Sequence, residues 1–570
     1  MRSSLLAVLA FAYAVAAGTP HHQGGKGNRQ PYVRVRNGTY SGVYSAEYDQ
    51  DFFLGIPYAQ PPIEDLRFRT PQSLNTRWRG ARNATAYTPT CVGYGGDQIG
   101  YEVSEDCLYL NVVRPAGIKR RNLPVAFWIH GGGYFMGSGV DRRYNLTFMV
   151  QNGVDIGKPF IGVSINYRLS AWGFLNSEEV QESGQTNLGL RDQRLAMQWV
   201  RENIGAFGGD PDKVTIFGES AGASSVGYQL TAYNGRDDKL FRGAIMQSGS
   251  PVYYGSVNDT EYFQPLYNSV VNQAGCSGAA DTLQCLRDVP YAQLNAVINQ
   301  TEFRGTFVPA IDGDFFQRLI STQLEDGAFV HVPIISGANS DEGTAFSPQG
   351  INTTEIFYQN VVNPTGRFFR RLPEWFGQAI LEAYPDIPAL GIPGTPPLPA
   401  DFRPGPPFGA QFRRSAAYYG DATFIAPRRQ TCQTWAGAGV PAYCYRFNVI
   451  VAGIPAIIGA THFQEVAFVF YNLQGVGYAL NPFTNKTEEY TELARLMTSS
   501  WASFVVDQDP NSFRAGGRAF AEVEPWPRYD NADPQDFVWS VNETSYAEPD
   551  TYRAEGMRLI NENAEEVYHR

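Results

Sequence analysis

Basic residues, long apolar runs and internal repeats are all scarce in this chain of 570 residues. Lys and Arg number 45 against 56 Asp and Glu, and the net charge of −11 argues against nucleic acid or an anionic membrane surface as a partner. After the first residues no stretch reaches the ~18 uninterrupted apolar residues of a membrane span, so we expect no stable membrane insertion. No repeat of fixed period is present. The sequence does not indicate an oligomeric state. With 43% hydrophobic residues, the chain is typical of a globular protein with a large core.

The beginning of the chain is typical of a secretory signal peptide. Arg2 precedes an apolar run from Leu5 to Ala16, and small residues follow. We therefore expect a signal peptide at 1–17, with a retained anchor as the alternative. The polar residues at 18–31 predict a disordered tail, and one domain is expected at 32–570.

Sequons and cysteines support passage through the secretory pathway. Eight Asn-x-Ser/Thr sequons are predicted glycosylation sites: Asn37, Asn83, Asn145, Asn258, Asn299, Asn352, Asn485 and Asn542. The six cysteines are an even number, as an oxidising compartment favours. Neighbours in the sequence suggest the pairs Cys91–Cys107, Cys276–Cys285 and Cys432–Cys444. We predict a secreted, extracellular glycoprotein, with vacuolar or cell-wall retention as alternative destinations.

Short apolar strands alternate with helix-like segments through most of the chain. Strands are expected at 32–35, 39–44, 108–113, 124–129, 159–166, 214–217, 241–247, 330–336 and 442–451. Helices are expected at 188–204 and 487–505, and mainly helical structure at 251–329. Three prolines in 52–68 predict an extended loop there, and nine prolines in 385–407 favour a loop or an extended insertion. The alternation indicates an α/β protein with a large, mostly parallel sheet that helices cover on both faces.

One pentapeptide carries the strongest chemical signal. Val214 to Phe217 are β-branched or aromatic, as a short buried strand requires, and Gly218-Glu219-Ser220-Ala221-Gly222 then fits G-x-S-x-G. A serine on such a strand-to-helix turn sits in strained backbone with its hydroxyl exposed. The alternative is a glycine-rich turn with a surface serine. The surrounding strand and helix pattern favours a nucleophile at Ser220.

A glycine run precedes this turn by about 90 residues and fits the oxyanion-hole loop of lipases and esterases. His130-Gly131-Gly132-Gly133 directly follows the predicted strand at 124–129. Consecutive glycines at a strand end let the backbone approach a ligand and point N–H groups at it. Alone, the run also fits an ordinary loop.

A nucleophilic serine needs a histidine base, which lies after the acid in the chain order Ser, acid, His. Of the six histidines, two lie in the predicted tail. His130 and His331 precede or interrupt the required order, and we expect His569 to be frayed as the penultimate residue. Elimination leaves His462 as the base, with a structural histidine as the alternative.

The acid is expected just beyond the carboxyl end of a sheet strand. The apolar strand that ends at Ser336 is followed by a turn that contains Asp341 and Glu342. Spacing does not separate these two carboxylates, and either also fits an ordinary solvated turn.

With these residues in place, the chain resembles a type-B carboxylesterase/lipase, the family that includes fungal lipases and the cholinesterases. The resemblance covers about Tyr32 to Tyr529. Its motifs are Phe53–Ala59, Ser104–Asn111, the His-Gly-Gly-Gly loop, Asn187–Gln193, Gly218–Gly222, Ser340–Gly343, and His462 with Glu465.

The resemblance implies an α/β-hydrolase fold with helical insertions over the active-site gorge. It implies a catalytic triad of Ser220, Glu342 and His462, and no metal or organic cofactor. The oxyanion hole implied by the resemblance consists of Gly132, Gly133 and Ala221.

Structural supports follow from the same resemblance. It implies the ion pairs Arg67–Glu105 and Arg168–Asp192. The first two disulfides suggested above match family positions, whereas Cys432–Cys444 rests on parity and proximity.

Two departures from the family bear on the substrate. Only fifteen residues lie between Cys91 and Cys107, where family lipases carry a long mobile lid. This loop also lacks the tryptophan with which cholinesterases hold a quaternary ammonium.

We therefore predict a secreted serine carboxylesterase that hydrolyses small-molecule esters through an acyl-enzyme. The alternatives are a triacylglycerol or sterol-ester lipase, and a biosynthetic esterase or transesterase that acts on a secondary metabolite. A non-catalytic adhesion homologue is disfavoured, because such homologues lack one or more triad groups and all are present here.

Overall fold

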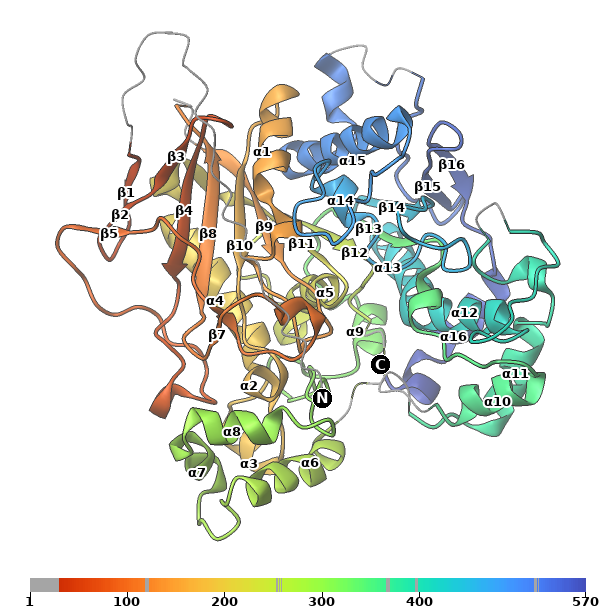
Figure 1. Ribbon diagram of the computed structural model, residues 1–570, viewed down its shortest axis with the longest axis horizontal. Coiled ribbons are helices and arrows are strands. Elements are labelled where there is room, and N and C mark those ends of the chain that lie inside the picture. The colour runs from red at the N-terminus through yellow and green to blue at the C-terminus, as the bar shows by residue number, and fades with distance from the viewer. Residues whose placement is uncertain are drawn as a thin grey trace, which may run out of the picture.

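A computed structural model describes residues 30–570 except 118–121, 253, 254, 256, 258, 365–369, 395–397, 517–519 and 521. The predicted signal peptide, most of the predicted tail and Asn258 lie outside the described residues. An eleven-stranded sheet forms the centre of the molecule, in the order β16-β15-β14-β13-β12-β11-β9-β10-β8-β4-β3 (Figure 1). Its strands are β3 (Val43–Ser45), β4 (Gln50–Pro57), β8 (Tyr109–Pro115), β9 (Leu123–Ile129), β10 (Ile161–Ile165), β11 (Gly209–Glu219), β12 (Gly243–Gln247), β13 (Ile334–Asn339), β14 (Ala442–Phe447), β15 (Gln535–Trp539) and β16 (Tyr546–Pro549).

The sheet is parallel from β10 through β9 to β15 and antiparallel at both ends. This confirms the predicted α/β class and the mostly parallel sheet. Two small sheets flank it. They consist of β1 (Tyr32–Arg34), β2 (Thr39–Ser41) and β5 (Ala81–Asn83), and of β6 (Thr90–Cys91) and β7 (Val103–Ser104).

Helices cover both faces of the sheet because successive strand residues point to opposite sides. Trp128 and Phe217 pack with α1 (Leu146–Asp155), α14 (Val466–Val469) and α15 (Glu488–Asp507) on one face. On the other face, the alternating apolar residues pack against α4 (Leu188–Asn203), α5 (Ala221–Gly235) and α13 (Ala426–Gly437) (Figure 1). The remaining helices are α2 (Ser170–Phe174), α3 (Glu178–Glu182), α6 (Thr260–Gln273), α7 (Thr282–Asp288), α8 (Tyr291–Ile298), α9 (Ile320–Glu325), α10 (Thr354–Val362), α11 (Glu374–Ala383), α12 (Phe412–Gly420) and α16 (Ala554–Glu562).

The loop predicted for 52–68 is wrong in its first half. Residues up to Pro57 belong to β4, which pairs with β3 on one side and β8 on the other. Pro57 is the last residue of the strand and the other two prolines lie beyond it, so no proline interrupts the ladder. Phe53 and Ile56 are buried in the core, and their packing decides in favour of the strand.

The chain end is ordered rather than frayed as predicted. The N–H of His569 donates to the carbonyl of Glu565, and its ring Nδ1 lies 2.9 Å from the carbonyl of Val257. The next residue, Arg570, has a buried side chain that donates to the carbonyl of Ala422. The last turn is therefore packed against the body of the domain.

Three disulfides join the six cysteines in the suggested pairs, Cys91–Cys107, Cys276–Cys285 and Cys432–Cys444. The two ion pairs implied by the resemblance are also present. Arg67 contacts Glu105 at 2.6 Å, and Arg168 contacts Asp192 at 2.7 Å. In the part of the chain that the structure describes, no helix is both long enough and apolar enough to cross a bilayer.

The predicted glycosylation sites differ in their surroundings. Five asparagines are exposed: Asn83, Asn299, Asn352, Asn485 and Asn542. Asn37 is half-buried and donates to two backbone carbonyls. The half-buried Asn145 caps α1 by accepting from the N–H of Thr147, and Thr147 is itself buried. Asn37 and Asn145 are therefore less accessible than the other sequon asparagines among the described residues.

Candidate active site

Ser220 stands at the corner between the end of β11 and the start of α5. Its backbone has φ +57 and ψ −127, a conformation that costs energy for any residue but glycine. A Cβ at Gly218 would lie 2.5 Å from the backbone of Gly222, so only glycine lets strand and helix come this close. The N–H of Ser220 donates to the carbonyl of Gln247, which ties the corner to β12. The elbow predicted from the sequence therefore has a physical basis in the packing at this corner.

His462 lies between Ser220 and Glu342. Its Nε2 is 2.9 Å from Ser220 Oγ, and its Nδ1 is 2.7 Å from Glu342 Oε2. The second oxygen of Glu342 accepts hydrogen bonds from the hydroxyl of Ser248 and the N–H of Asn339. The carboxylate is thus fully engaged and its orientation toward the imidazole is set.

Asp341, the other carboxylate that spacing left open, points elsewhere. Its two side-chain oxygens accept from the N–H groups of Gly394 and Ala460. Ala460 lies two residues before His462, so Asp341 holds the loop that carries the imidazole rather than the imidazole itself. Both Asp341 and Glu342 are buried, and neither is the solvated turn carboxylate that was the alternative.

The glycine run lies directly against the nucleophile. A Cβ at Gly131 would come within 3.0 Å of the Cβ of Ser220. Gly132 and Gly133 have φ +98 and +61, backbone conformations that glycine adopts without strain. No acceptor for either N–H is found among the described residues. Ala221 is the first residue of α5, where an N–H has no partner within the helix.

Two further buried glutamates, which sequence reasoning gave no catalytic or electrostatic role, surround His462. Glu219 Oε1 lies 3.3 Å from Nε2 of His462. Glu465 accepts from the amides of Gln247 and Asn339. Glu219 occupies the first variable position of the pentapeptide, and Glu465 is part of a family motif. Only their burial near the imidazole indicates that they influence its charge.

Charge around the imidazole determines its protonation. Burial disfavours the charged ring, but the negative charges of Glu342 and Glu219 outweigh this and raise the pKa of His462 to about 9. Burial raises the pKa of Glu219 well above its usual value, opposed by His462. Burial, with the charge of Glu342, also raises the pKa of Glu465. The site therefore favours the imidazolium that proton abstraction from Ser220 would create.

Aromatic rings enclose the base. Phe424 stacks on the imidazole of His462, with 4.7 Å between ring centres and 24° between planes. Phe346 meets the same ring edge-on at 5.1 Å. Near the glycine run, Phe135 is half-buried against Gly133. No sequence pattern had singled out these rings.

The other histidines that the structure describes lie away from this chemistry. His130 is buried, stacks on Tyr167 at 4.4 Å and has its pKa lowered by burial to about 4. His331 is exposed beside Phe329. Among the described residues, no three His, Cys, Asp or Glu side chains are grouped to hold a metal ion.

The loop between Cys91 and Cys107 is short and attached to the body of the domain. The side chain of Gln98 donates to the carbonyl of Cys91, which closes the loop on itself. Asp97 pairs with Arg143 at 2.6 Å, and the hydroxyl of Tyr101 accepts from the N–H of Arg142. This loop has no free length with which to swing across the site.

The chain matches the carboxylesterase family over residues 29–556. It is 32% identical over 567 residues to "Secreted triacylglycerol lipase LIP1" of Gibberella zeae, covering 93% of this chain and 90% of that protein. It is 35% identical over 538 residues to "Secreted lipase 1" of Botryotinia fuckeliana, covering 88% of each.

Solved structures show the same architecture. Aspergillus niger EstA superposes with a TM-score of 0.81 at 30% identity, covering 95% of this chain and 100% of that one. A structure named PNB esterase superposes with a TM-score of 0.72 at 26% identity, covering 93% of this chain and 99% of that one.

Proposed function

Since this chain belongs to the carboxylesterase family, has its α/β-hydrolase fold and is a carboxylic ester hydrolase, we propose that Ser220, His462 and Glu342 are its catalytic triad. The observation that carries the proposal is the imidazole of His462, which lies 2.9 Å from Ser220 Oγ and 2.7 Å from Glu342 Oε2. A serine hydroxyl becomes an effective nucleophile only when a base so placed removes its proton.

In the first half of the reaction, Ser220 Oγ attacks the ester carbonyl while Nε2 of His462 takes the hydroxyl proton. Glu342 stabilises the imidazolium through Nδ1–H. The N–H groups of Gly132, Gly133 and Ala221 donate to the oxyanion of the tetrahedral intermediate. His462 then returns the proton to the departing alcohol, and the acyl group remains on Ser220.

In the second half, His462 takes a proton from water as the water oxygen attacks the acyl carbonyl. A second tetrahedral intermediate collapses, the carboxylic acid leaves, and the proton returns to Ser220 Oγ. Every step is proton transfer or displacement at carbon, with no redox change, and apart from water and the ester the chain's own residues supply each group.

The loop between Cys91 and Cys107 is short and attached to the rest of the protein. This supports the proposal that the substrates are dissolved esters with short to medium acyl chains. A triacylglycerol lipase is the second candidate, because relatives carry that name. In such a lipase a long lid shields an apolar trough from water. Here the corresponding Cys91–Cys107 loop is short and is held in place by the Asp97–Arg143 ion pair.

We also propose that the protein is secreted to the outside of the cell. The two relatives compared are named secreted lipases, and the chain has three disulfides and five exposed sequon asparagines. An oxidising compartment favours such disulfides. The signal peptide at 1–17, cleaved in the mature protein, accounts for entry into this pathway.

An active-site-directed organophosphonate tests the triad. It should inactivate the enzyme with one label per chain, and mass spectrometry should find the label on Ser220. Ser220→Ala should lower kcat for p-nitrophenyl acetate by at least ~10⁴-fold with unchanged circular dichroism. A label on another residue, or an active alanine variant, would refute the assignment.

A further inference from the structure

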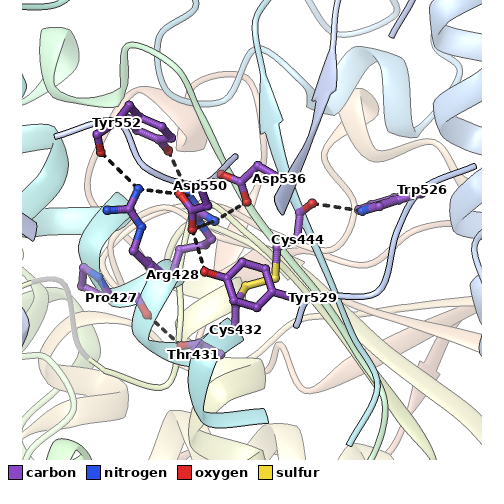
Figure 2. The surroundings of a disulfide bond; sticks show 11 residues. Pro427, Arg428, Thr431, Cys432, Cys444, Trp526, Tyr529, Asp536, Asp550 and Tyr552 are labelled. Atoms are coloured by element: carbon purple, nitrogen blue, oxygen red, sulfur yellow. Dashed lines mark hydrogen bonds and ion pairs between the residues drawn. A yellow bond between two sulfur atoms is a disulfide. The ribbon is translucent and has the colours of Figure 1, made fainter. Parts of the chain in front are cut away.

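A π-helical turn interrupts the long helix that follows the proline-rich segment. Between α12 and α13, residues Asp421–Ile425 form this turn, and the N–H of Ala426 donates five residues back to the carbonyl of Asp421. Pro427 gives the cause: it has no N–H, and its ring would clash with the carbonyl of Thr423 in a regular helix. A wider turn relieves the clash, and turns of this kind are frequent at functional sites. In the next turn, the side-chain hydroxyl of Thr431 donates to the carbonyl of Pro427 (Figure 2).

The turn carries one side chain to the candidate active site. Phe424 is 2% exposed and covers one face of the His462 ring. Phe346 packs against both rings, 5.1 Å from Phe424 and 5.1 Å from His462 between centres. Rotation of the imidazole about its Cβ–Cγ bond would lose the stacking contact. The plane of the base is therefore set by packing as well as by its two polar partners.

A buried ion pair anchors the turn. The carboxylate of Asp421 accepts from Arg553 at 2.6 and 2.7 Å and from the hydroxyl of Tyr384 at 2.9 Å. Both partners reach it from outside the helix, Tyr384 from the end of α11 and Arg553 from the segment before α16. Removing one partner of a buried pair leaves an uncompensated charge, so the pair resists opening.

The segment that carries Arg553 is itself held in place. Figure 2 shows Arg428 of α13 between Asp536 and Asp550, beside the Cys432–Cys444 disulfide. Arg429 contacts Asp550 at 2.5 Å, and the hydroxyl of Tyr529 donates to the same carboxylate. The ion pairs of Asp550 thus lie three residues before Arg553 and limit its movement.

The same helix also supports the turn that carries the acid. Gly343, next to Glu342, lies so close to α12 that a Cβ would come within 1.9 Å of the carbonyl of Ala416. It would also lie 2.4 Å from the N atom of Gly420, directly before the π turn. The segment formed by α12 and the π turn therefore contacts Gly343, the residue after the acid, at one point and the base at another.

We propose that Phe424, presented by the π turn Asp421–Ile425, is a positioning residue that holds the His462 imidazole in the plane that serves both Ser220 and Glu342. This rests on the triad role of His462 proposed above. A misplacement of about 1 Å can cost on the order of 10²-fold in rate, so a loosened ring lowers kcat. The ring face also attracts the imidazolium that forms during the reaction.

The test compares three variants on p-nitrophenyl acetate, whose small acyl group minimises effects on substrate fit. In Phe424→Leu, kcat per phosphonate-titrated site should fall roughly 10- to 100-fold while KM stays within about threefold. Inactivation by a small methylphosphonate should slow in parallel, because it uses the same base. Phe424→Tyr keeps an aromatic ring and should retain most of kcat. Phe357→Leu, which removes an equally buried ring on α10, should leave kcat and the inactivation rate unchanged.

Proton NMR gives a readout that a purely structural loss would not move. The His462 Nδ1–H held by Glu342 should give a far-downfield resonance in the wild type and in Phe357→Leu, and this resonance should broaden or vanish in Phe424→Leu. Arg553→Lys, remote from the substrate, should lower kcat several-fold with KM unchanged, because one ammonium cannot replace the bidentate contact to Asp421. This variant keeps the proposal testable if Phe424→Leu does not fold.

The inference would be overturned if Phe424→Leu kept the wild-type kcat, inactivation rate and downfield resonance. It would also be overturned if Phe357→Leu lost as much kcat as Phe424→Leu. Where Phe424→Leu does not fold, wild-type kcat in Arg553→Lys would overturn it. None of these results affects the proposed triad, which fails instead if the wild-type label is not on Ser220.

Discussion

The guanidinium of Arg143 lies 4.7 Å from the centre of the Phe463 ring. Phe463 directly follows His462 and has φ +76, a conformation unusual for an aromatic residue. The same guanidinium pairs with Asp141 and with Asp97 of the Cys91–Cys107 loop. One cation therefore connects the short disulfide loop to the segment that carries the proposed base.

Substitutions of Asp97 and Arg143 should separate the effect of this cation on the disulfide loop from its effect on the proposed base. Asp97→Asn should increase hydrogen exchange in residues 92–106 while kcat changes less than about threefold, because the pair is partly exposed. Arg143→Met should increase exchange in the same loop and also lower kcat, since a cation–π contact worth about 0.5–2 kcal/mol is lost beside His462. Hydrogen exchange with mass spectrometry and steady-state kinetics check this prediction. Equal kinetic effects of the two changes would contradict it.

The two adjacent carboxylates should differ in what they support. Glu342→Gln should cost on the order of 10³–10⁴ in kcat with little change in folding, because the imidazolium loses its counter-charge. Asp341→Asn should have a mild effect on kcat per titrated site but lower the free energy of unfolding by about 1–3 kcal/mol, because buried N–H groups lose a charged acceptor. Denaturant unfolding and active-site titration measure the two quantities. The reverse ranking would assign the acid to Asp341.

The pH profile should reflect the carboxylates around His462. The base acts in its neutral form, and its pKa is raised above 6.5 by Glu342 and Glu219, so kcat/KM should rise with pH through an apparent pKa above 6.5. In Glu219→Gln the group beside Nε2 can no longer carry a negative charge, so the pKa of the imidazole should fall. The acid limb of kcat/KM should then move to lower pH, whereas Glu202→Gln, at the exposed end of α4, should leave it in place. An unshifted limb in Glu219→Gln would show that this carboxyl carries no charge in the free enzyme.

Rate measured against the concentration of a short triglyceride should show no jump at the solubility limit. The Cys91–Cys107 loop is closed by a disulfide and held by Arg143, so we expect no lid to open at a lipid surface. Butyrylcholine should be a poor substrate, since the loop has no tryptophan to bind its ammonium. A steep rise beyond the solubility limit, with preference for long acyl chains, would favour the triacylglycerol lipase.

Glycan occupancy should follow the accessibility of each sequon. In protein from its native host, the asparagines with exposed side chains should carry glycans, namely Asn83, Asn299, Asn352, Asn485 and Asn542. Asn145 should be unoccupied, because it caps α1 and Thr147 of its sequon is buried. Glycosidase digestion in heavy-oxygen water followed by peptide mass spectrometry reads each site. A fully occupied Asn145, or no glycan at any sequon, would contradict the prediction.

Much of the fold follows from local sequence patterns. Apolar runs located the parallel strands from β9 to β14 but not β15, because a strand buried on both faces needs apolar side chains throughout. The corner at Ser220 was recognisable because its backbone demands glycine at fixed positions on either side. The 52–68 segment was misread because pairing of β4 with β8, far along the chain, outweighs the local effect of prolines at its end.

The arrangement around His462 was decided only by the tertiary structure. Whether Asp341 or Glu342 reaches the imidazole depends on where a turn after β13 points each side chain, and neighbouring residues of the same charge look alike in a sequence. Glu219, Glu465 and Phe424 become recognisable only when separate segments, the one with Glu219 more than 200 residues before His462, bury them around one ring. The sequence by itself determined the α/β class, most of the parallel strands, the elbow and the choice of histidine, because those depend on local backbone demands and on chain order. Packing between distant segments decided which carboxylate and which aromatic rings surround that histidine, because burial and charge are properties of the assembled core.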